Sequence, residues 1–179
     1  MSKNIEVEVR SFVDEGQFEN IKNILDRDYE FVKELKETTV YFSGEKDLRM
    51  RKNETEAFVI LKEGKIHDDF RKEFEVRIDK DDFGNMAELF QGLGYEIEIE
   101  WQRNRLEYKN ADMKVLLDDT KGYGKILELE KMVEEGNEDK AHSLLAEEIS
   151  KFGIAKITSK EEFNEKFEYY KQNWKILIR

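Results

Sequence analysis

The chain of 179 residues contains no cysteine and no proline. The absence of cysteine excludes disulfide bonds, thiol catalysis and thiolate metal sites, and is typical of a reducing compartment. No stretch approaches the ~18 apolar residues of a membrane-spanning helix. The first ten residues, MSKNIEVEVR, lack the apolar core of a signal peptide. We therefore expect a cytoplasmic protein that does not bind membranes.

Positive charge is also scarce. The chain has 31 Lys and Arg but 42 Asp and Glu, which gives a net charge of −11. Surfaces that bind nucleic acids or anionic membranes need clustered Lys and Arg, so this balance argues against both partners. Hydrophobic residues make up 39% of the chain, enough for a core, and no low-complexity stretch suggests a linker. We expect a single domain over residues 1–179.

What the sequence does contain is a repeated alternation of charged and apolar residues. A Glu-x-Glu pattern followed by a basic residue occurs in IEVEVR (5–10), EFEVRI (73–78) and LELEK (127–131). In a strand, successive side chains point to opposite faces, so each segment has one charged and one apolar face. The same alternation occurs in DLRMR, QRNRLEY and KVLLDD. When the charged face of each strand is counted, these faces together hold nine basic residues (10, 49, 51, 62, 71, 77, 103, 105, 114) and seven acidic ones (6, 8, 73, 75, 118, 128, 130).

Four amphipathic helices are predicted beside these strands. Asp14 with Gln17, and Ser159 with Glu162, form capping boxes at two helix starts, and the last helix covers about 159–174. Strands are predicted at 5–10, 38–51, 55–63, 69–78, 95–109, 112–118 and 127–131. Because few helices separate consecutive strands, the pattern favours an antiparallel α+β fold.

Two arrangements of the charged faces are compatible with this pattern. They can face water as the outer surface of an open sheet. If the helices instead cover the outside of a closed barrel, the charged faces line its interior. Burying so many charges is costly unless they are paired or matched by a ligand. The alternation alone does not decide between the two.

An ordered set of motifs spans residues 4 to 155. It consists of Glu6-x-Glu8-x-Arg10, Arg49-x-Arg51, Lys62, Arg71-x-Glu73-x-Glu75, Arg103-x-Arg105 with Tyr108, Asp118 in LLDD, the KGYGK turn and Glu128-x-Glu130. In this order and spacing the chain resembles the CYTH superfamily, also called the triphosphate tunnel metalloenzymes. The resemblance implies a closed eight-stranded antiparallel β-barrel with amphipathic helices packed outside. Its charged interior would be a tunnel for a triphosphate and a divalent metal.

The chain departs from the family pattern at two positions. The family usually begins with Glu-x-Glu-x-Lys, whereas this chain has Arg10, which keeps the charge but not the compact ammonium group. Thr39 stands where members resembling the cyclases tend to carry an Asp. Both departures weigh against cyclisation.

The resemblance also implies roles for individual residues. Carboxylate oxygens suit Mg²⁺ or Mn²⁺, and guanidinium groups suit phosphate oxygens. The expected metal ligands are Glu6, Glu8, Asp118, Glu128 and Glu130. The expected substrate-binding residues are Arg49, Arg51, Lys62, Arg71, Arg103 and Arg105. Catalytic roles are expected for Arg10, Lys62, Glu73 and Glu75; internal ion pairs are an equal alternative for Arg71, Glu73, Glu75 and Arg77.

The family contains class IV adenylate cyclases, thiamine triphosphatases and inorganic tripolyphosphatases. We therefore expect an enzyme, a monomer or homodimer, that cleaves a phosphoanhydride bond of a small-molecule triphosphate with Mg²⁺ or Mn²⁺. One alternative is a class IV adenylate cyclase that forms cyclic AMP and pyrophosphate from ATP. The other is a polyphosphate-binding module without turnover.

Overall fold

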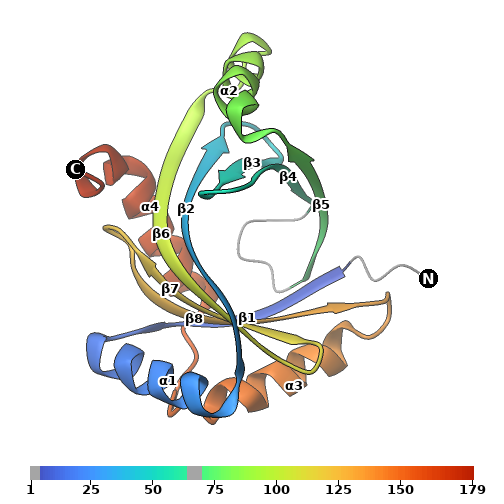
Figure 1. The fold of residues 1–179 in the computed structure, drawn as a ribbon, viewed down its shortest axis with the longest axis vertical. Helices are drawn as coiled ribbons and strands as arrows, with labels where there is room; N and C mark the ends of the chain where they lie inside the picture. The colour runs from blue at the N-terminus through green and yellow to red at the C-terminus, as the bar shows by residue number, and fades with distance from the viewer. Residues whose placement is uncertain (1–4, 64–69) are drawn as a thin grey trace.

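The computed structural model describes residues 5–63 and 70–179, with the backbone alone at residues 70 and 71. A ring of strands surrounded by helices forms the molecule (Figure 1). Its elements are β1 (Ile5–Val13), α1 (Glu15–Asp28), β2 (Glu30–Phe42), β3 (Asp47–Lys52), β4 (Ala57–Glu63), β5 (Phe70–Ile78), a 3₁₀ turn (Lys80–Asp82), α2 (Phe83–Gly92), β6 (Ile97–Asn110), β7 (Met113–Thr120), β8 (Gly124–Val133), α3 (Glu138–Ser150) and α4 (Lys160–Leu177).

The strands of the described ranges close into a barrel in the order β1-β5-β4-β3-β2-β6-β7-β8. All neighbouring strands are antiparallel. β1 closes the ring, because it pairs along its whole length with β8 and over residues 5–7 with β5. The predicted α+β fold with a closed eight-stranded antiparallel barrel is therefore confirmed.

One predicted strand was wrong. The segment 38–51 was expected to be a single strand, but it contains the end of β2, a turn at residues 43–46, and most of β3. Gly44 lies in that turn with φ of 136°, a conformation that favours glycine. The turn lets β2 and β3 pair with each other as neighbours in the ring, with Tyr41 opposite Arg49.

Both predicted capping boxes are present. The Asp14 side chain accepts a hydrogen bond from the backbone N–H of Gln17 at 2.8 Å, and Gln17 accepts one in return from Asp14. Ser159 and Glu162 make the same reciprocal pair at the start of α4. These bonds satisfy donors that the first helical turn leaves without partners.

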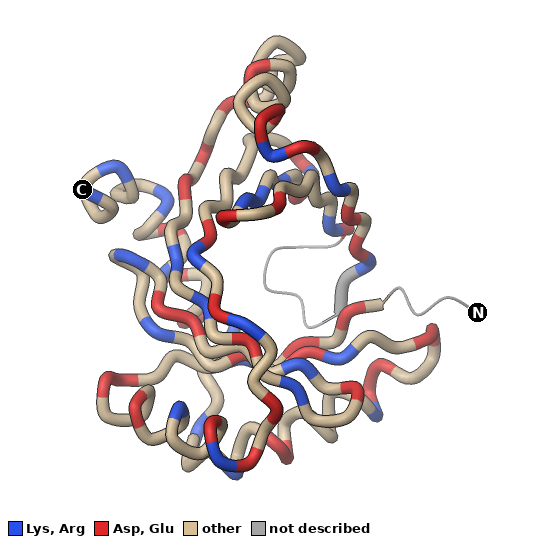
Figure 2. Tube along the Cα trace, in the orientation of Figure 1, with Lys and Arg blue, Asp and Glu red and all other residues tan. Residues whose placement is uncertain are grey.

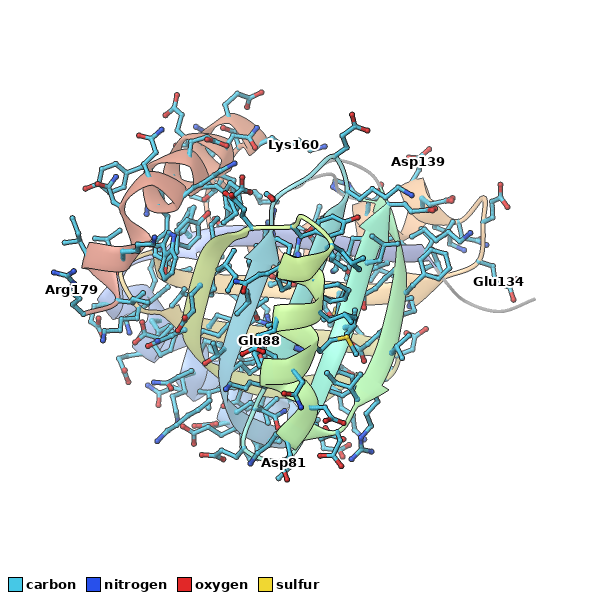
Figure 3. All side chains as sticks on the ribbon, turned by 90° about the horizontal axis from the view of Figure 1, so that it is seen from above. Asp81, Glu88, Glu134, Asp139, Lys160 and Arg179 are labelled. Carbon is cyan, nitrogen blue, oxygen red and sulfur yellow. The ribbon has the colours of Figure 1, made fainter. Side chains whose placement is uncertain are left out.

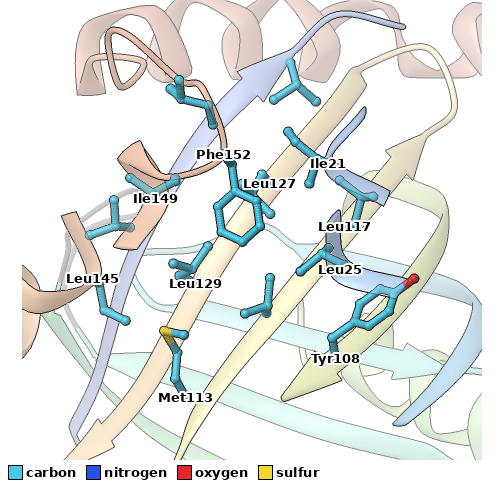
Figure 4. Close-up of a cluster of buried hydrophobic side chains, with 14 of the residues drawn as sticks. Ile21, Leu25, Tyr108, Met113, Leu117, Leu127, Leu129, Leu145, Ile149 and Phe152 are labelled. Atoms are coloured by element: carbon cyan, nitrogen blue, oxygen red, sulfur yellow. The ribbon is translucent and has the colours of Figure 1, made fainter. Parts of the chain in front are cut away.

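The main hydrophobic core lies outside the ring, between the strands and two helices (Figure 4). Val7, Val9 and other apolar strand residues point outward and are buried. Ile21 of α1 and Leu145 of α3 cover them and are themselves 0% exposed. Because this burial holds the outer faces of β1, β7 and β8 against helices, the opposite faces of those strands point into the ring.

The other two helices cover further parts of the ring. α2 packs through Phe83 and Phe90 on the apolar side of β2, β3 and β4. α4 lies at one end of the ring, as Figure 3 shows with Lys160 and Arg179 labelled near its ends. The side chains buried between α4 and the strands form a cluster that we call the α4 cluster. Its members are Ile99, Trp101, Tyr123, Ile126, Phe163, Phe167 and Tyr170, the last three from α4 itself. Among the described residues, none of the helices is long and apolar enough to cross a membrane.

Candidate functional site

The ring encloses a cavity of about 310 Å³, which we call the tunnel. All eight described strands contribute side chains to its lining, and so do Phe163 and Phe167 of α4. Figure 2 shows basic and acidic residues interspersed along the strands of the ring, and residues of both signs line the tunnel. The charged strand faces therefore point inward, which decides between the two arrangements that the sequence left open.

The tunnel brings together nearly all of the predicted site residues. The ones that line it are Glu6, Glu8, Arg10, Arg49, Arg51, Lys62, Glu73, Glu75, Arg103, Arg105, Asp118, Glu128 and Glu130. The side chain of Arg71 lies outside the described residues. Arg77, one of the nine basic residues counted on the charged faces, does not line the tunnel: its side chain is 67% exposed and pairs with Glu56 at 3.4 Å.

Four carboxylates of β1 and β8 gather on one wall. The antiparallel register places Glu8 directly opposite Glu130, and Arg10 opposite Glu128. Burial and the nearby Glu130 raise the pKa of Glu6 to about 8. Burial, Glu8 and Glu130 raise the pKa of Glu128 to about 8. Like charges directly across a strand pair repel each other, so this wall favours protons or cations.

Lysine side chains provide part of that compensation. Lys62 Nζ lies 2.6 Å from carboxylate oxygens of both Glu6 and Glu73, and so joins β1, β4 and β5. Burial would raise the pKa of Glu73, but Lys62 lowers it below its usual value. Lys114 pairs with Glu130 at 2.9 Å. Burial alone would raise the pKa of Glu130, but Lys114 holds it well below its usual value.

Two arginines of β6 share the carboxylate of Asp118. Arg105 donates to both oxygens of Asp118 at 2.7 Å, and Arg103 donates to one of them at 3.2 Å. Asp118 and Arg105 are buried, with 2% and 7% of their surfaces exposed. The metal role of Asp118 remains a prediction, and both of its oxygens already accept bonds from guanidinium groups.

Glu37 of β2 is a further tunnel carboxylate that the sequence analysis missed. Its oxygens lie 2.8 Å from Arg103, 3.7 Å from Arg51 and 3.9 Å from Arg105. Burial would raise the pKa of Glu37, but these three guanidinium groups lower it to about 2. The alternation in KELKETTVY (33–41) was the available signal, because Lys33, Leu35, Glu37, Thr39 and Tyr41 all line the tunnel.

At the α4 end of the tunnel, two arginines lie against aromatic rings. Arg10 Cζ is 4.6 Å from the centre of the Phe163 ring, and Arg49 Cζ is 4.4 Å from that of Tyr41. Arg10 pairs with Glu8 at 3.3 Å. Arg49 forms a two-pronged pair with Asp47, a buried carboxylate that the sequence analysis also missed. Cation–π contacts and ion pairs hold both guanidinium groups in fixed orientations.

The carboxylate wall fits a hard divalent cation in its chemistry, because Glu6, Glu8, Glu128 and Glu130 offer oxygen ligands only. Among residues 5–63 and 70–179, no three acidic or histidine side chains are arranged as a complete ligand group. Mg²⁺ is usually held by one or two carboxylates together with substrate phosphates.

Comparison with known proteins gives the family. The closed ring with a lining of both charges is the tunnel architecture expected from the sequence. The model of the CYTH domain matches residues 4–163, so the chain belongs to the CYTH family. Members of this family are typically divalent-metal-dependent enzymes that bind small triphosphates.

Individual relatives agree with this assignment. "Putative adenylate cyclase MJ0240" of Methanocaldococcus jannaschii is 28% identical over 163 residues, covering 85% of this chain and 91% of the relative. The structure of PH1012 from Pyrococcus horikoshii has a TM-score of 0.72 at 25% identity, over 88% of this chain and 93% of that one. HpAC1 of Hippeastrum, described as a "putative adenylyl cyclase" with a dominant triphosphatase activity, has a TM-score of 0.64 at 17% identity, over 88% and 91% of the two chains.

Proposed function

We propose that this protein is a divalent-metal-dependent triphosphatase that binds a small triphosphate in the tunnel and hydrolyses a phosphoanhydride bond. The observation that carries the proposal is the lining itself, in which guanidinium groups and a carboxylate wall face each other across one cavity of about 310 Å³. Guanidinium groups match phosphate oxygens, and carboxylates match the cation that accompanies a polyphosphate.

The arginines would hold the phosphate oxygens. Arg51 supports this role because its Nε is buried and has no hydrogen-bond partner among the described residues. Arg49, Arg103, Arg105 and Lys62, with Arg71, complete the proposed substrate set. A phosphate oxygen placed at Arg51 Nε would satisfy that donor and gain a charge-assisted hydrogen bond.

Glu6, Glu8, Glu128 and Glu130, with Asp118, are the proposed metal ligands, and the bound ion would neutralise both the carboxylates and the phosphate oxygens. Water attacks the terminal phosphorus, and the new P–O bond forms as the bridging P–O bond breaks. Orthophosphate is released, and the diphosphate part of the substrate leaves with the bridging oxygen. Glu73 and Glu75 are the carboxylates proposed to accept the proton of that water. Lys62 and Arg10 stabilise the charge that shifts to the leaving oxygen.

Adenylate cyclase activity is the second candidate, because the M. jannaschii relative carries that name. In that reaction the ribose 3′ hydroxyl of ATP attacks the α-phosphorus instead of water. The two reactions are separated by incubating the purified protein with tripolyphosphate, thiamine triphosphate or ATP and Mg²⁺ or Mn²⁺, and measuring phosphate, pyrophosphate and cyclic AMP. We expect orthophosphate as the main product, because Thr39 departs from the pattern of the cyclases and Arg10 from that of the family. Cyclic AMP and pyrophosphate as main products from ATP would establish the cyclase instead.

The metal requirement is tested by Glu8→Gln and by excess chelator. We expect chelator to abolish turnover of the wild type. Glu8→Gln should reduce turnover by at least about tenfold. Loss of a residue that only supports a metal ligand typically costs that much, and Glu8 is a proposed ligand itself. Neutralising Glu8 removes its repulsion from Glu130 but also its ion pair with Arg10. Because these two effects oppose each other, the melting temperature should change little. Glu147→Gln, on the exposed side of α3, is the matched control with full activity. Full activity in chelator would contradict the metal assignment.

A further inference from the structure

The α4 cluster contains a buried hydroxyl without a partner. Trp101 Nε1 donates a hydrogen bond to Thr120 Oγ1 at 3.1 Å, and the Tyr170 hydroxyl donates to the carbonyl oxygen of Glu100 at 3.1 Å. The Tyr123 hydroxyl is equally buried but has no hydrogen-bond partner among the described residues. A buried polar group without a partner destabilises the folded state, so a ligand absent from the described structure is a candidate partner.

The ring of Tyr123 is held firmly in place. Its centroid lies 4.4 Å from that of Trp101 and 5.5 Å from that of Tyr170, and only 7% of the residue is exposed. The preceding Gly122 has φ of 75°, and a Cβ there would come within 2.5 Å of Leu177 Cβ. The turn is therefore pressed against α4, and the hydroxyl has little freedom to find another partner in the protein.

The hydroxyl of Tyr123 lies close to an arginine of the tunnel wall. Tyr123 lines the tunnel together with Arg10, Tyr41 and Arg49. Burial raises the pKa of Tyr123, and the positive charge of Arg10 opposes this rise, so the two groups are neighbours. Phe163 of α4, whose ring makes a cation–π contact with Arg10, also lines the tunnel. The fixed guanidinium group of Arg10 beside an unsatisfied O–H donor can bind an anion.

We propose that the Tyr123 hydroxyl donates a hydrogen bond to a phosphoryl group of a polyphosphate, in a subsite formed with Arg10 and Arg49 at the α4 end of the tunnel. This inference rests on the proposed binding of a triphosphate.

The test compares Tyr123→Phe with Tyr170→Phe, two substitutions that each remove one hydroxyl from the α4 cluster. Binding of tripolyphosphate is measured by calorimetry in excess chelator, where the metal-dependent reaction does not run. We expect Tyr123→Phe to weaken binding about tenfold, the usual loss for one hydrogen bond to an anion. Its melting temperature without ligand should equal or exceed that of the wild type, because an unsatisfied group is removed. Tyr170→Phe should melt at a lower temperature and bind as tightly as the wild type.

The outcomes are distinguishable from a failure of the proposed function. If the wild type and Tyr123→Phe bind tripolyphosphate equally tightly, the hydroxyl holds no phosphoryl group and the inference is overturned, while the triphosphate tunnel stands. If the wild type binds no tripolyphosphate with or without Mg²⁺, both are overturned. Equal weakening by Tyr123→Phe and Tyr170→Phe would show a packing effect and would also overturn the inference.

Discussion

Glu37 shows how a single buried charge depends on its partners. The residue is 5% exposed, and the guanidinium groups of Arg51, Arg103 and Arg105 surround its carboxylate. Burial disfavours the ionised form, whereas the three cations favour it. The cations prevail, because the pKa of Glu37 falls from 4.5 to about 2.

This pKa predicts how stability depends on pH. Because the folded state lowers the pKa of Glu37, its contribution is fully present above about pH 4.5 and is lost as the pH falls towards 2. We expect Glu37→Gln to lower the free energy of unfolding by about 3 kcal/mol at pH 7. The difference from the wild type should shrink between pH 4.5 and 2. Urea unfolding at several pH values measures both effects.

The matched control for this pH dependence is Glu147→Gln, which changes an exposed carboxylate in the same way. Its stability should equal that of the wild type at every pH. A difference between Glu37→Gln and the wild type that stays constant from pH 7 to pH 2 would contradict the ion-pair explanation.

Which residues face the tunnel was largely predictable from the sequence, whereas their partners were not. The two-residue alternation places Arg49, Arg51, Arg103 and Arg105 on charged strand faces, and the family resemblance correctly predicts that these faces point inward. It does not reveal that Glu37 binds Arg103, since β2 and β6 become neighbours only through the strand order of the ring. The unsatisfied hydroxyl of Tyr123 likewise depends on packing, which no local pattern encodes.

At the scale of elements, α4 connects the helical surface to the tunnel. One face of this helix carries Phe163 and Phe167 into the tunnel wall, and its first turn depends on the cap at Ser159. The helix begins and caps where the sequence predicts, and it extends beyond the predicted residue 174 to Leu177. Its position at one end of the ring was not predictable from its own amphipathic pattern.

The cap of α4 gives an element-scale prediction. Ser159→Ala removes the side chain that accepts from the Glu162 N–H at 3.2 Å. We expect a loss of about 1 kcal/mol in the free energy of unfolding, or roughly 2 to 4 °C in melting temperature. Ser143→Ala, at an exposed position in the middle of α3, is the matched control and should leave the melting temperature unchanged. If both variants melt like the wild type, the capping box contributes nothing measurable to stability.

The sequence pattern predicted most of the individual elements but not their closure into a ring. Periodicity predicted most strands and all four described helices, but it merged β2 and β3 because the SGEK turn was overlooked. Closure depends on the pairing of β1 with both β5 and β8, contacts that are far apart in sequence. The closed barrel was therefore expected from the family resemblance and not from the strand pattern.

At the scale of the whole molecule, the tunnel holds charges of both signs that are nearly balanced. Among the described residues it is lined by eight Lys and Arg and ten Asp and Glu, in place of the nine and seven counted from the sequence. Burial, together with the neighbouring carboxylates, raises the pKa values of Glu6 and Glu128. A cation on the carboxylate wall and an anion among the arginines would together relieve the repulsion on both sides.

Ligand binding should therefore stabilise the whole fold. A ligand that binds only the native state contributes ~2.7 kcal/mol at a hundredfold excess over Kd. For a chain of this size we expect tripolyphosphate with Mg²⁺ to raise the melting temperature by roughly 5 to 10 °C, measured by calorimetry. Arg51→Ala removes a guanidinium group whose Nε has no hydrogen-bond partner among the described residues, so the rise in melting temperature should be smaller. Arg49→Ala, which removes another arginine of the tunnel, should also reduce the rise. Glu147→Gln should retain the full rise. Equal rises in the wild type and both arginine variants would contradict phosphate binding in the tunnel, because an anion held elsewhere on the molecule would not depend on these two side chains.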